Sequence, residues 1–166
     1  MDSAAPHAFT TFLRYADYSL LRCLSADPEQ ARHAPNKTVR QVKSGHYVEV
    51  LPTPLPNPHY VIHSQLFFRE LNLSERAARE GSFMQFFTGD PMAAVAAANA
   101  DVAPPRVLAG GWASGYALSI YGQEIYHNCP FKNGNGYGDG RAISVLEVLL
   151  HSGQRWEFQL KGGGTT

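Results

Sequence analysis

The chain has 166 residues, the length of one ordinary domain, and its 44% hydrophobic and 17% charged residues exclude an intrinsically disordered chain. Its formal net charge is zero, so nothing in the composition indicates the broad positive surface that typically binds nucleic acid or an anionic membrane. No stretch of the sequence is apolar for long enough to span a membrane.

The first third of the chain predicts a helix, two short strands and an extended segment. Residues 10–24 have the apolar spacing of a helix. Residues 38–50 predict two short strands joined by a Ser-Gly turn. The segment that follows carries four alternate prolines, which exclude a helix and favour an extended surface connector over a ligand for a proline-binding domain: Pro52, Pro54, Pro56 and Pro58.

Polar residues at helix starts predict three further helices. Ser64 is expected to cap a helix that ends at residue 72, and Ser74 a helix that ends near residue 87. An Asp-Pro pair at residues 90 and 91 favours the start of a helix over the alanine-rich stretch PMAAVAAANA. Glycines interrupt the pattern in residues 110–128, which is therefore helical only in part. No internal repeat or linker divides the chain.

The last segment predicts an antiparallel hairpin that follows a glycine-rich loop. Residues 142–150 are rich in Ile, Val and Leu and predict a strand, and HSGQ predicts a turn. Residues 155–161 alternate, with Trp156, Phe158 and Leu160 on one face and polar side chains on the other. The loop NGNGYGDG leads into the first of these strands.

The hairpin predicts two cationic side chains close to the loop. With the turn centred near residues 152 and 153, Lys161 is expected opposite Ser144, and Arg141 is three residues away, about 10 Å along a strand. Gly138 and Gly140 allow a ligand to approach the backbone and expose N–H groups that bind phosphate oxygens. Arg141 offers a bidentate fork and Lys161 a compact charge.

This pattern predicts a phosphate site, with one ordinary alternative. The loop fits neither GxGxxG nor the P-loop motif. Glycine with asparagine and aspartate is also typical of a turn, and a lysine on an edge strand often serves only solubility.

Histidine and cysteine residues form no recognised metal or catalytic motif. His59 and His63 are four residues apart and His127 lies two residues before Cys129, but neither set supplies three ligands, and HExxH and GxSxG are absent. We therefore expect no metal at these residues. Cys23 and Cys129 are far apart in the sequence, which favours free thiols and a reducing compartment.

The loop and strand residues resemble a known family. GDGRAISVLEV followed by RWEFQLKGGGTT is closely similar to the selenoprotein O family of kinase-like protein adenylyltransferases. VLPTPLPNPHYVIHS and FFTGD match that family's N-terminal region in the same order, so the resemblance runs from about Tyr18 to the end of the chain. Many members carry YGGHQFG and then WAGQLGDGR where this chain has YALSIYGQEIYHNCPFKNGNGYGDGR, which indicates a divergent branch.

The resemblance implies a fold, an activity and site residues. Members of the family bind ATP turned around relative to active kinases and transfer AMP to Ser, Thr or Tyr hydroxyls of proteins. Gly138, Gly140 and Arg141 match the family's ATP-binding glycine loop, and Lys161 matches the lysine that contacts the phosphates. The expected fold class is α+β, the N-terminal lobe portion of a protein-kinase-like fold, with helices flanking an antiparallel sheet that includes the glycine-loop hairpin.

On this interpretation residues 1–166 form a single incomplete domain. The expected cofactors are ATP and Mg²⁺, with the catalytic aspartate and the magnesium ligands beyond residue 166, so the fragment alone is expected to be inactive. The expected partners are ATP and protein substrates, with neither nucleic acid nor a membrane. Alternatives are a non-catalytic nucleotide-binding pseudokinase module and a truncated inactive fragment. The resemblance implies a mitochondrial location, and the alternative is the cytoplasm.

Overall fold

The computed structural model describes residues 5–99, 106–121, 123, 126–129, 131–132 and 143–161. The fold is α+β, as the sequence predicts. In chain order the elements are α1 (Phe9–Phe12), η1 (Leu13–Tyr15), α2 (Ser19–Cys23), β1 (Val48–Val50), α3 (Gln65–Glu70), η2 (Ala77–Arg79), α4 (Gly81–Phe87), α5 (Pro91–Asn99), β2 (Gly111–Ala113), α6 (Gly115–Ser119), η3 (Tyr126–Asn128), β3 (Ile143–Leu149) and β4 (Arg155–Leu160).

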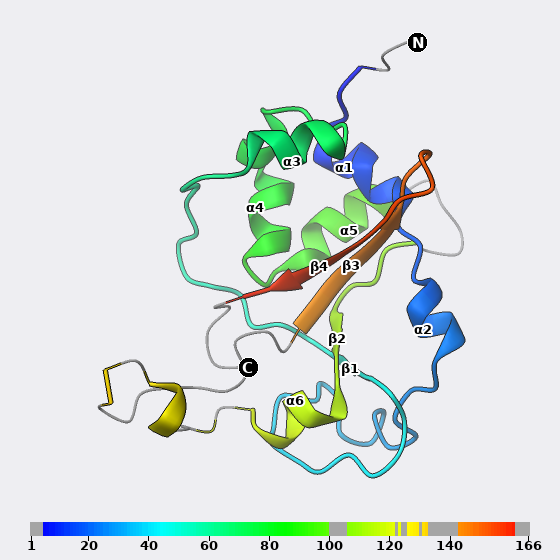
Figure 1. The fold of residues 1–166 in the computed structure, drawn as a ribbon, viewed down its shortest axis with the longest axis vertical. Coiled ribbons are helices and arrows are strands. Elements are labelled where there is room, and N and C mark those ends of the chain that lie inside the picture. The colour runs from blue at the N-terminus through cyan, green and yellow to red at the C-terminus, as the bar shows by residue number, and fades with distance from the viewer. Residues whose placement is uncertain are drawn as a thin grey trace.

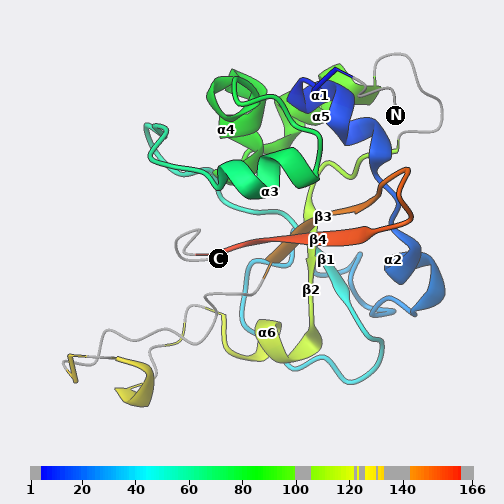
Figure 2. The ribbon, with the colours of Figure 1, turned by 45° about the horizontal axis from the view of Figure 1, so that its top comes forward.

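The described strands form one antiparallel sheet in the order β1-β2-β3-β4. Helices α3, α4 and α5 lie in the connection between β1 and β2, and β3 and β4 form the predicted hairpin. β2 pairs with β3 only where Trp112 faces Ser144, so most of the β3 edge extends beyond β2. Both views show β1 and β2 running away from the hairpin toward α6 (Figures 1 and 2).

A helical layer covers the apolar face of the hairpin. Helices α1, α3, α4 and α5 gather on one side of β3 and β4, whereas α2 and α6 lie elsewhere (Figures 1 and 2). The Phe158 ring lies 6.1 Å from that of Phe12 and 5.9 Å from that of Phe87, and Phe67 meets Trp156 edge-on at 5.0 Å. The apolar face predicted for β4 is therefore the one that contacts the core.

The helix expected over residues 10–24 is wrong as one element. The chain forms α1 and η1, leaves the helical conformation at Ala16, and starts again at α2. Ala16 forms a β-bridge with Val148, and the Asp17 N–H donates to the Glu147 carbonyl at 2.8 Å. These residues cover the β3 edge that β2 leaves unpaired, and that long-range pairing outweighs the local helical pattern.

Other predicted elements are confirmed or shortened. Ser64 caps α3 by accepting a hydrogen bond from the Phe67 N–H, and α5 starts at Pro91 as expected. The helix expected over residues 74–87 is divided into η2 and α4, because Glu80 adopts an extended conformation between them. Of the two strands expected in residues 38–50, only β1 forms. In the segment expected to form the other strand, the Arg40 N–H donates to the carbonyl of Leu118 in α6 and not to a strand partner.

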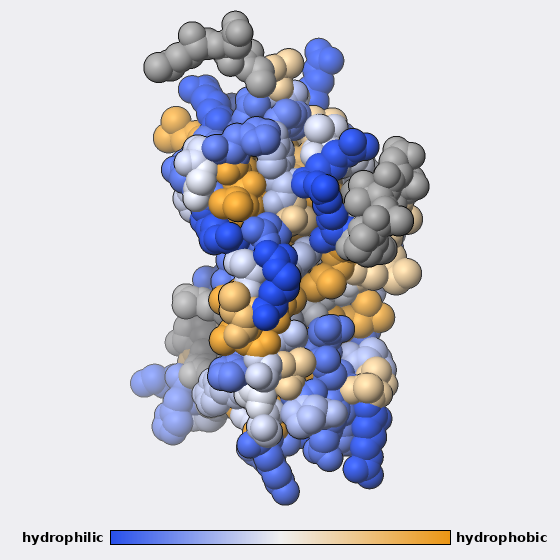
Figure 3. All heavy atoms as spheres, turned by 90° about the vertical axis from the view of Figure 1, so that its right-hand side faces the viewer, coloured by the Kyte–Doolittle hydropathy of each residue, from blue (hydrophilic) through white to orange (hydrophobic). Residues whose placement is uncertain are grey.

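The surface that carries α2 is largely polar. Figure 3 shows this side of the molecule, with hydrophilic residues over most of it and apolar side chains gathered at mid-height. Across the described ranges, no helix has the length and apolar character needed to cross a membrane.

Candidate functional site

The hairpin turn is centred on Ser152, half a residue before the position predicted between residues 152 and 153. The Leu150 N–H donates to the Gln154 carbonyl at 2.9 Å, and the Gly153 N–H donates to the Leu150 carbonyl at 2.9 Å. Gly153 has a φ of 82°, a left-handed conformation that glycine adopts without strain. These contacts define a three-residue turn centred on Ser152.

An irregularity just after Ser144 in β3 shifts the strand pairing further. Ser144 pairs with Gln159, and Ile143 pairs with Leu160. The expected pairing of Lys161 with Ser144 is therefore wrong, because the turn and the irregularity together move the register. Lys161 is the first residue after β4, and its side chain is exposed.

Of the four predicted site residues, Lys161 alone falls within the described ranges. Gly138, Gly140 and Arg141 lie outside the described residues. The structure therefore fixes Lys161 at the end of β4, next to the start of β3, while the expected convergence with the loop stays a prediction. Within the described part of the chain, no ion pair involves Lys161.

The sheet face that leads to Lys161 is polar. Along β4, Arg155, Glu157 and Gln159 alternate with the aromatic residues that meet the core. The Ser144 hydroxyl donates to Glu157 Oε1, and Gln159 Nε2 donates to Ser144 Oγ at 3.3 Å and to Glu157 Oε1 at 3.1 Å. Continued alternation puts Lys161 on the same face as Gln159.

A hollow of about 220 Å³ lies over this polar face. It is lined by residues of α2 and the residue after it, by the two residues before β1, and by residues of β2, β3 and β4. Its polar lining side chains are His46, Tyr47, Ser114, Ser144, Glu157 and Gln159, and its large apolar ones are Leu20, Leu24 and Trp112.

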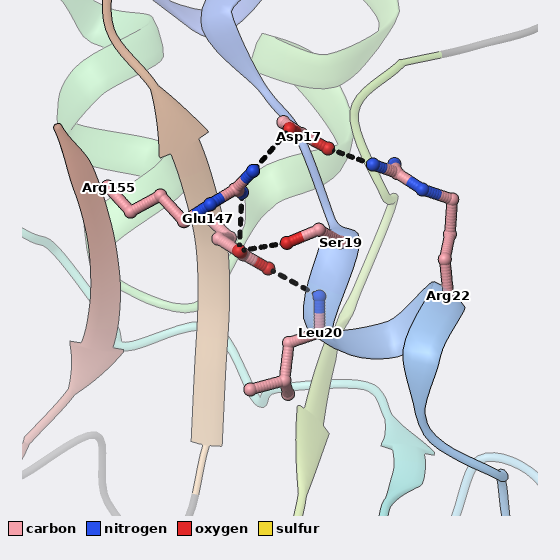
Figure 4. A network of polar contacts seen from close by, with 6 residues as sticks. All are labelled: Asp17, Ser19, Leu20, Arg22, Glu147 and Arg155. Atoms are coloured by element: carbon pink, nitrogen blue, oxygen red, sulfur yellow. Dashed lines mark hydrogen bonds and ion pairs between the residues drawn. The ribbon is translucent and has the colours of Figure 1, made fainter. Parts of the chain in front are cut away.

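A buried carboxylate attaches α2 to the hairpin, as Figure 4 shows. Glu147 of β3 is only 6% exposed. Its carboxylate accepts hydrogen bonds from the Ser19 hydroxyl at 2.9 Å, from the Leu20 N–H at 3.2 Å and from the Arg155 guanidinium at 3.0 Å. No side chain of α2 caps this helix, so Glu147 supplies the acceptor for its first turn from another element. We call Asp17, Ser19, Glu147 and Arg155, with the Leu20 N–H, the Glu147 network.

Asp17 extends the Glu147 network to a second arginine. Its carboxylate accepts from Arg22 of α2 and, at 3.1 Å, from Arg155 of β4 (Figure 4). The hydrogen bond from Arg22 has the largest influence on the pKa of Asp17 and lowers this pKa. Burial raises the pKa, and the hydrogen bond from Arg155 lowers it. The net effect is a pKa below the ordinary value of 3.8. Asp17 is therefore ionised at neutral pH and ties α2 to the hairpin.

The structure offers no metal cluster in its described ranges, which contain no group of three or more His, Cys, Asp or Glu side chains suited to an ion. His63 instead hydrogen bonds to the Tyr60 hydroxyl at 2.7 Å and to the Glu75 carboxylate at 2.6 Å. Cys23 is exposed and Cys129 is buried, and no disulfide bond joins them.

Sequence reasoning missed the Glu147 network. Its one visible signal is a glutamate within the otherwise apolar strand ISVLEVL, since a carboxylate that is buried there requires donors. Nothing local to Glu147 identifies those donors, because Ser19 and Leu20 lie more than a hundred residues earlier.

Comparison with known proteins identifies relatives over most of this chain. It is 36% identical to the protein nucleotidyltransferase YdiU of Azoarcus sp. strain BH72 over 151 residues, or 90% of this chain and 24% of the relative. The YdiU protein of Methylobacillus flagellatus is 31% identical over 155 residues (90% and 24%), and that of Xanthomonas axonopodis pv. citri is 32% identical over 156 residues (94% and 24%).

The chain spans about a quarter of the length of these curated relatives. No family model matches it, and no solved structure gives a significant match. The matches to these YdiU proteins cover 90–94% of this chain. The chain belongs to that family, as a divergent member related to the bacterial protein nucleotidyltransferase YdiU.

Proposed function

We propose that this chain contributes the phosphate-binding hairpin of an ATP-dependent protein adenylyltransferase. The observation that carries the proposal is the identity of 31–36% to proteins named protein nucleotidyltransferase, over 90% of this chain. In the proposed reaction a Ser, Thr or Tyr hydroxyl oxygen of a substrate protein bonds to the α-phosphorus of ATP. The bond between the α- and β-phosphates breaks, the hydroxyl loses its proton, and pyrophosphate leaves.

Lys161 is the described residue that we assign to the phosphates. It is exposed, it follows β4 directly, and it lies beside the start of β3, into which the glycine-rich loop leads. A lysine ammonium is a compact charge suited to phosphate oxygens. Gly138 and Gly140 would contribute backbone N–H groups and Arg141 a bidentate guanidinium, in keeping with their match to the family motif.

Within the described ranges, no group of three or more His, Cys, Asp or Glu side chains is suited to a metal ion. The groups that we assign to the ATP phosphates are the Lys161 ammonium, the Arg141 guanidinium and the backbone N–H groups of the glycine-rich loop. We therefore assign no metal-dependent step to this chain's own residues. The arrangement of the lobe as protein-kinase-like and a mitochondrial location are further parts of the proposal, both suggested by the family resemblance.

The test uses the full-length protein with Mg²⁺ and ATP labelled on either the α- or the γ-phosphate. We expect label to reach protein from the α-phosphate only. Lys161→Ala should reduce this incorporation about 100-fold, as for loss of one group that stabilises transition-state charge. Its melting temperature should not change, because Lys161 is exposed. Lys43→Ala, which removes another exposed lysine, is the matched control and should leave incorporation unchanged.

Each other outcome excludes part of the proposal. Incorporation from the γ-phosphate would indicate kinase chemistry instead. Nucleotide binding without incorporation from either position would indicate a non-catalytic module. Full α-label incorporation by Lys161→Ala would contradict the assignment of this lysine.

A further inference from the structure

Two adjoining hollows lie at the turn of the β3–β4 hairpin, near α1 and at the opposite end of β4 from Lys161 (Figures 1 and 2). The first, of about 460 Å³, is lined by residues of α1 and η1, by Arg106 and by the end of β3. The second, of about 330 Å³, is lined by residues at the end of α3 and in the turn. Tyr15 and His151 line both hollows, which we together call the turn groove. Both volumes lie in the range of about 300–1,000 Å³ that is typical of binding sites.

The first hollow of the turn groove carries an excess of positive charge. The titratable side chains that line it, besides Tyr15, are Arg14, Asp17, Arg106 and His151. The Asp17 carboxylate accepts hydrogen bonds from Arg22 and Arg155, so two guanidinium groups already balance its charge. Arg106 is exposed, and no ion pair found among the described residues involves it. This distribution of charge favours an anionic ligand beside Arg106.

The second hollow offers aromatic and aliphatic surface. The Tyr15 and His151 rings meet edge-on with centroids 5.0 Å apart, and the Tyr15 hydroxyl forms a hydrogen bond with His7 Nε2 at 3.0 Å. These contacts fix the Tyr15 ring between the two hollows. The leucine residues that directly follow α3 and β3 add aliphatic surface, and Glu70 contributes a carboxylate. This hollow therefore suits an apolar side chain and disfavours a second carboxylate.

A peptide segment that carries acidic residues next to an apolar residue matches both hollows. Its carboxylates are attracted by Arg106 in the first hollow and repelled by Glu70 in the second. Its apolar side chain can contact the Tyr15 ring and the leucine residues of the second hollow. Because the two hollows share Tyr15 and His151, neighbouring residues of one peptide can reach both. A small inorganic anion, by contrast, matches only the first hollow.

We propose that the turn groove docks an acidic segment of the protein substrates, with an adjacent apolar residue in the second hollow. The inference rests on the proposed function, because it takes proteins as the acceptors of AMP. From Arg155 to Lys161 the chain extends about 20 Å at a rise of about 3.3 Å per residue. An extended substrate therefore needs about six or more residues between the docked segment and the hydroxyl that accepts AMP. Docking holds this hydroxyl at a high effective concentration near the phosphates.

The experiment measures the binding of labelled peptides to the full-length protein by fluorescence anisotropy. One peptide carries a run of glutamates followed by a leucine, and a second replaces the glutamates by glutamines. Wild type should bind the glutamate peptide about tenfold more tightly than the glutamine peptide. Arg106→Glu replaces an attraction by a repulsion and should abolish this roughly tenfold preference. Arg76→Glu, which reverses another exposed arginine outside the turn groove, is the matched control and should retain the preference.

A second readout follows AMP transfer to a longer peptide, in which a tyrosine lies about eight residues from the glutamates. Arg106→Glu should raise the KM for this peptide about tenfold and leave kcat unchanged, because docking contributes to binding and not to the chemical step. Its affinity for inorganic tripolyphosphate and its melting temperature should be those of wild type, since Arg106 is exposed and distant from Lys161.

The two readouts separate this inference from the proposed function. Equal wild-type affinity for the glutamate and glutamine peptides, or an unchanged KM in Arg106→Glu, would overturn the docking site and leave AMP transfer standing. Displacement of the glutamate peptide by an equal concentration of inorganic phosphate would indicate a small-anion site and also overturn it. The expected loss of preference in Arg106→Glu, without AMP transfer by wild type, would support the peptide site and reject the proposed activity. If wild type neither binds the peptides nor transfers AMP, both proposals fail.

Discussion

Removal of the Glu147 carboxylate tests how strongly the Glu147 network holds α2 to the sheet. Glu147 is 6% exposed and is the acceptor for the Ser19 hydroxyl, the Leu20 N–H and the Arg155 guanidinium. Truncation to alanine leaves these donors without an acceptor. Breaking a buried ion pair costs about 3–5 kcal/mol, but the Arg155 side chain is 44% exposed and water replaces part of its interaction. We therefore expect Glu147→Ala to lower the free energy of unfolding by about 3 kcal/mol.

A glutamine at this position gives a sharper comparison. Glu147→Gln keeps the shape of the side chain but replaces one acceptor oxygen by an amide that only donates. One of the three donors then lacks an acceptor, and we expect a loss of about 1–2 kcal/mol. Urea unfolding followed by circular dichroism measures both variants, with a shift of the midpoint at constant slope.

Glu157 supplies a matched control, because it pairs directly opposite Glu147 and is exposed. Glu157→Gln should change the free energy of unfolding by less than about 0.5 kcal/mol. Equal losses in the two glutamine variants would show that burial and the contacts to α2 do not decide the effect, and the reasoning would be refuted. Hydrogen exchange at the Leu20 N–H should be faster in Glu147→Gln and unchanged in Glu157→Gln.

Three further predictions follow from local contacts. The pKa of Asp17 is lowered in the folded state, so the ionised carboxylate stabilises the fold relative to Asp17→Asn. This difference in the free energy of unfolding should be complete above the ordinary pKa of 3.8 and lost as the pH falls below that value. Acid unfolding of both proteins measures it, and a difference that grows on acidification would contradict the prediction. Ser64→Ala should cost about 1 kcal/mol through loss of the α3 cap in urea unfolding, whereas Ser82→Ala, which removes no cap, should have little effect. Gly111→Ala should destabilise by about 1–3 kcal/mol, since its Cβ would lie 2.4 Å from a β3 carbonyl oxygen, whereas Gly81→Ala meets no atom within 4 Å and should be neutral; equal melting temperatures would reject the close approach.

Features that depend on neighbouring residues were predictable. The alternation of β4 follows from the pleat, and the same alternation places Trp156 and Phe158 against the helices. The cap at Ser64 requires only the three residues after it. The phosphate role of Lys161 comes from the motif resemblance and stays a prediction; the structure places Lys161, exposed, directly after β4.

Features that depend on distant residues were not predictable. The hairpin register changes by the geometry of the turn at Ser152 and by the irregularity after Ser144, and both are backbone adjustments without a sequence signal that we could read. The same limit applies to the hollow over the polar face, whose lining comes from α2, from the residues before β1 and from three strands that are separated in the sequence.

By itself, the sequence determined the fold class, the hairpin and the family, because each follows from short-range pattern or motif. Tertiary structure alone decided that the helix of residues 10–24 is divided at Ala16 and that Glu147 caps α2. The physical reason is the unpaired edge of β3. Its backbone groups and its buried carboxylate require partners, and a segment more than a hundred residues away provides them.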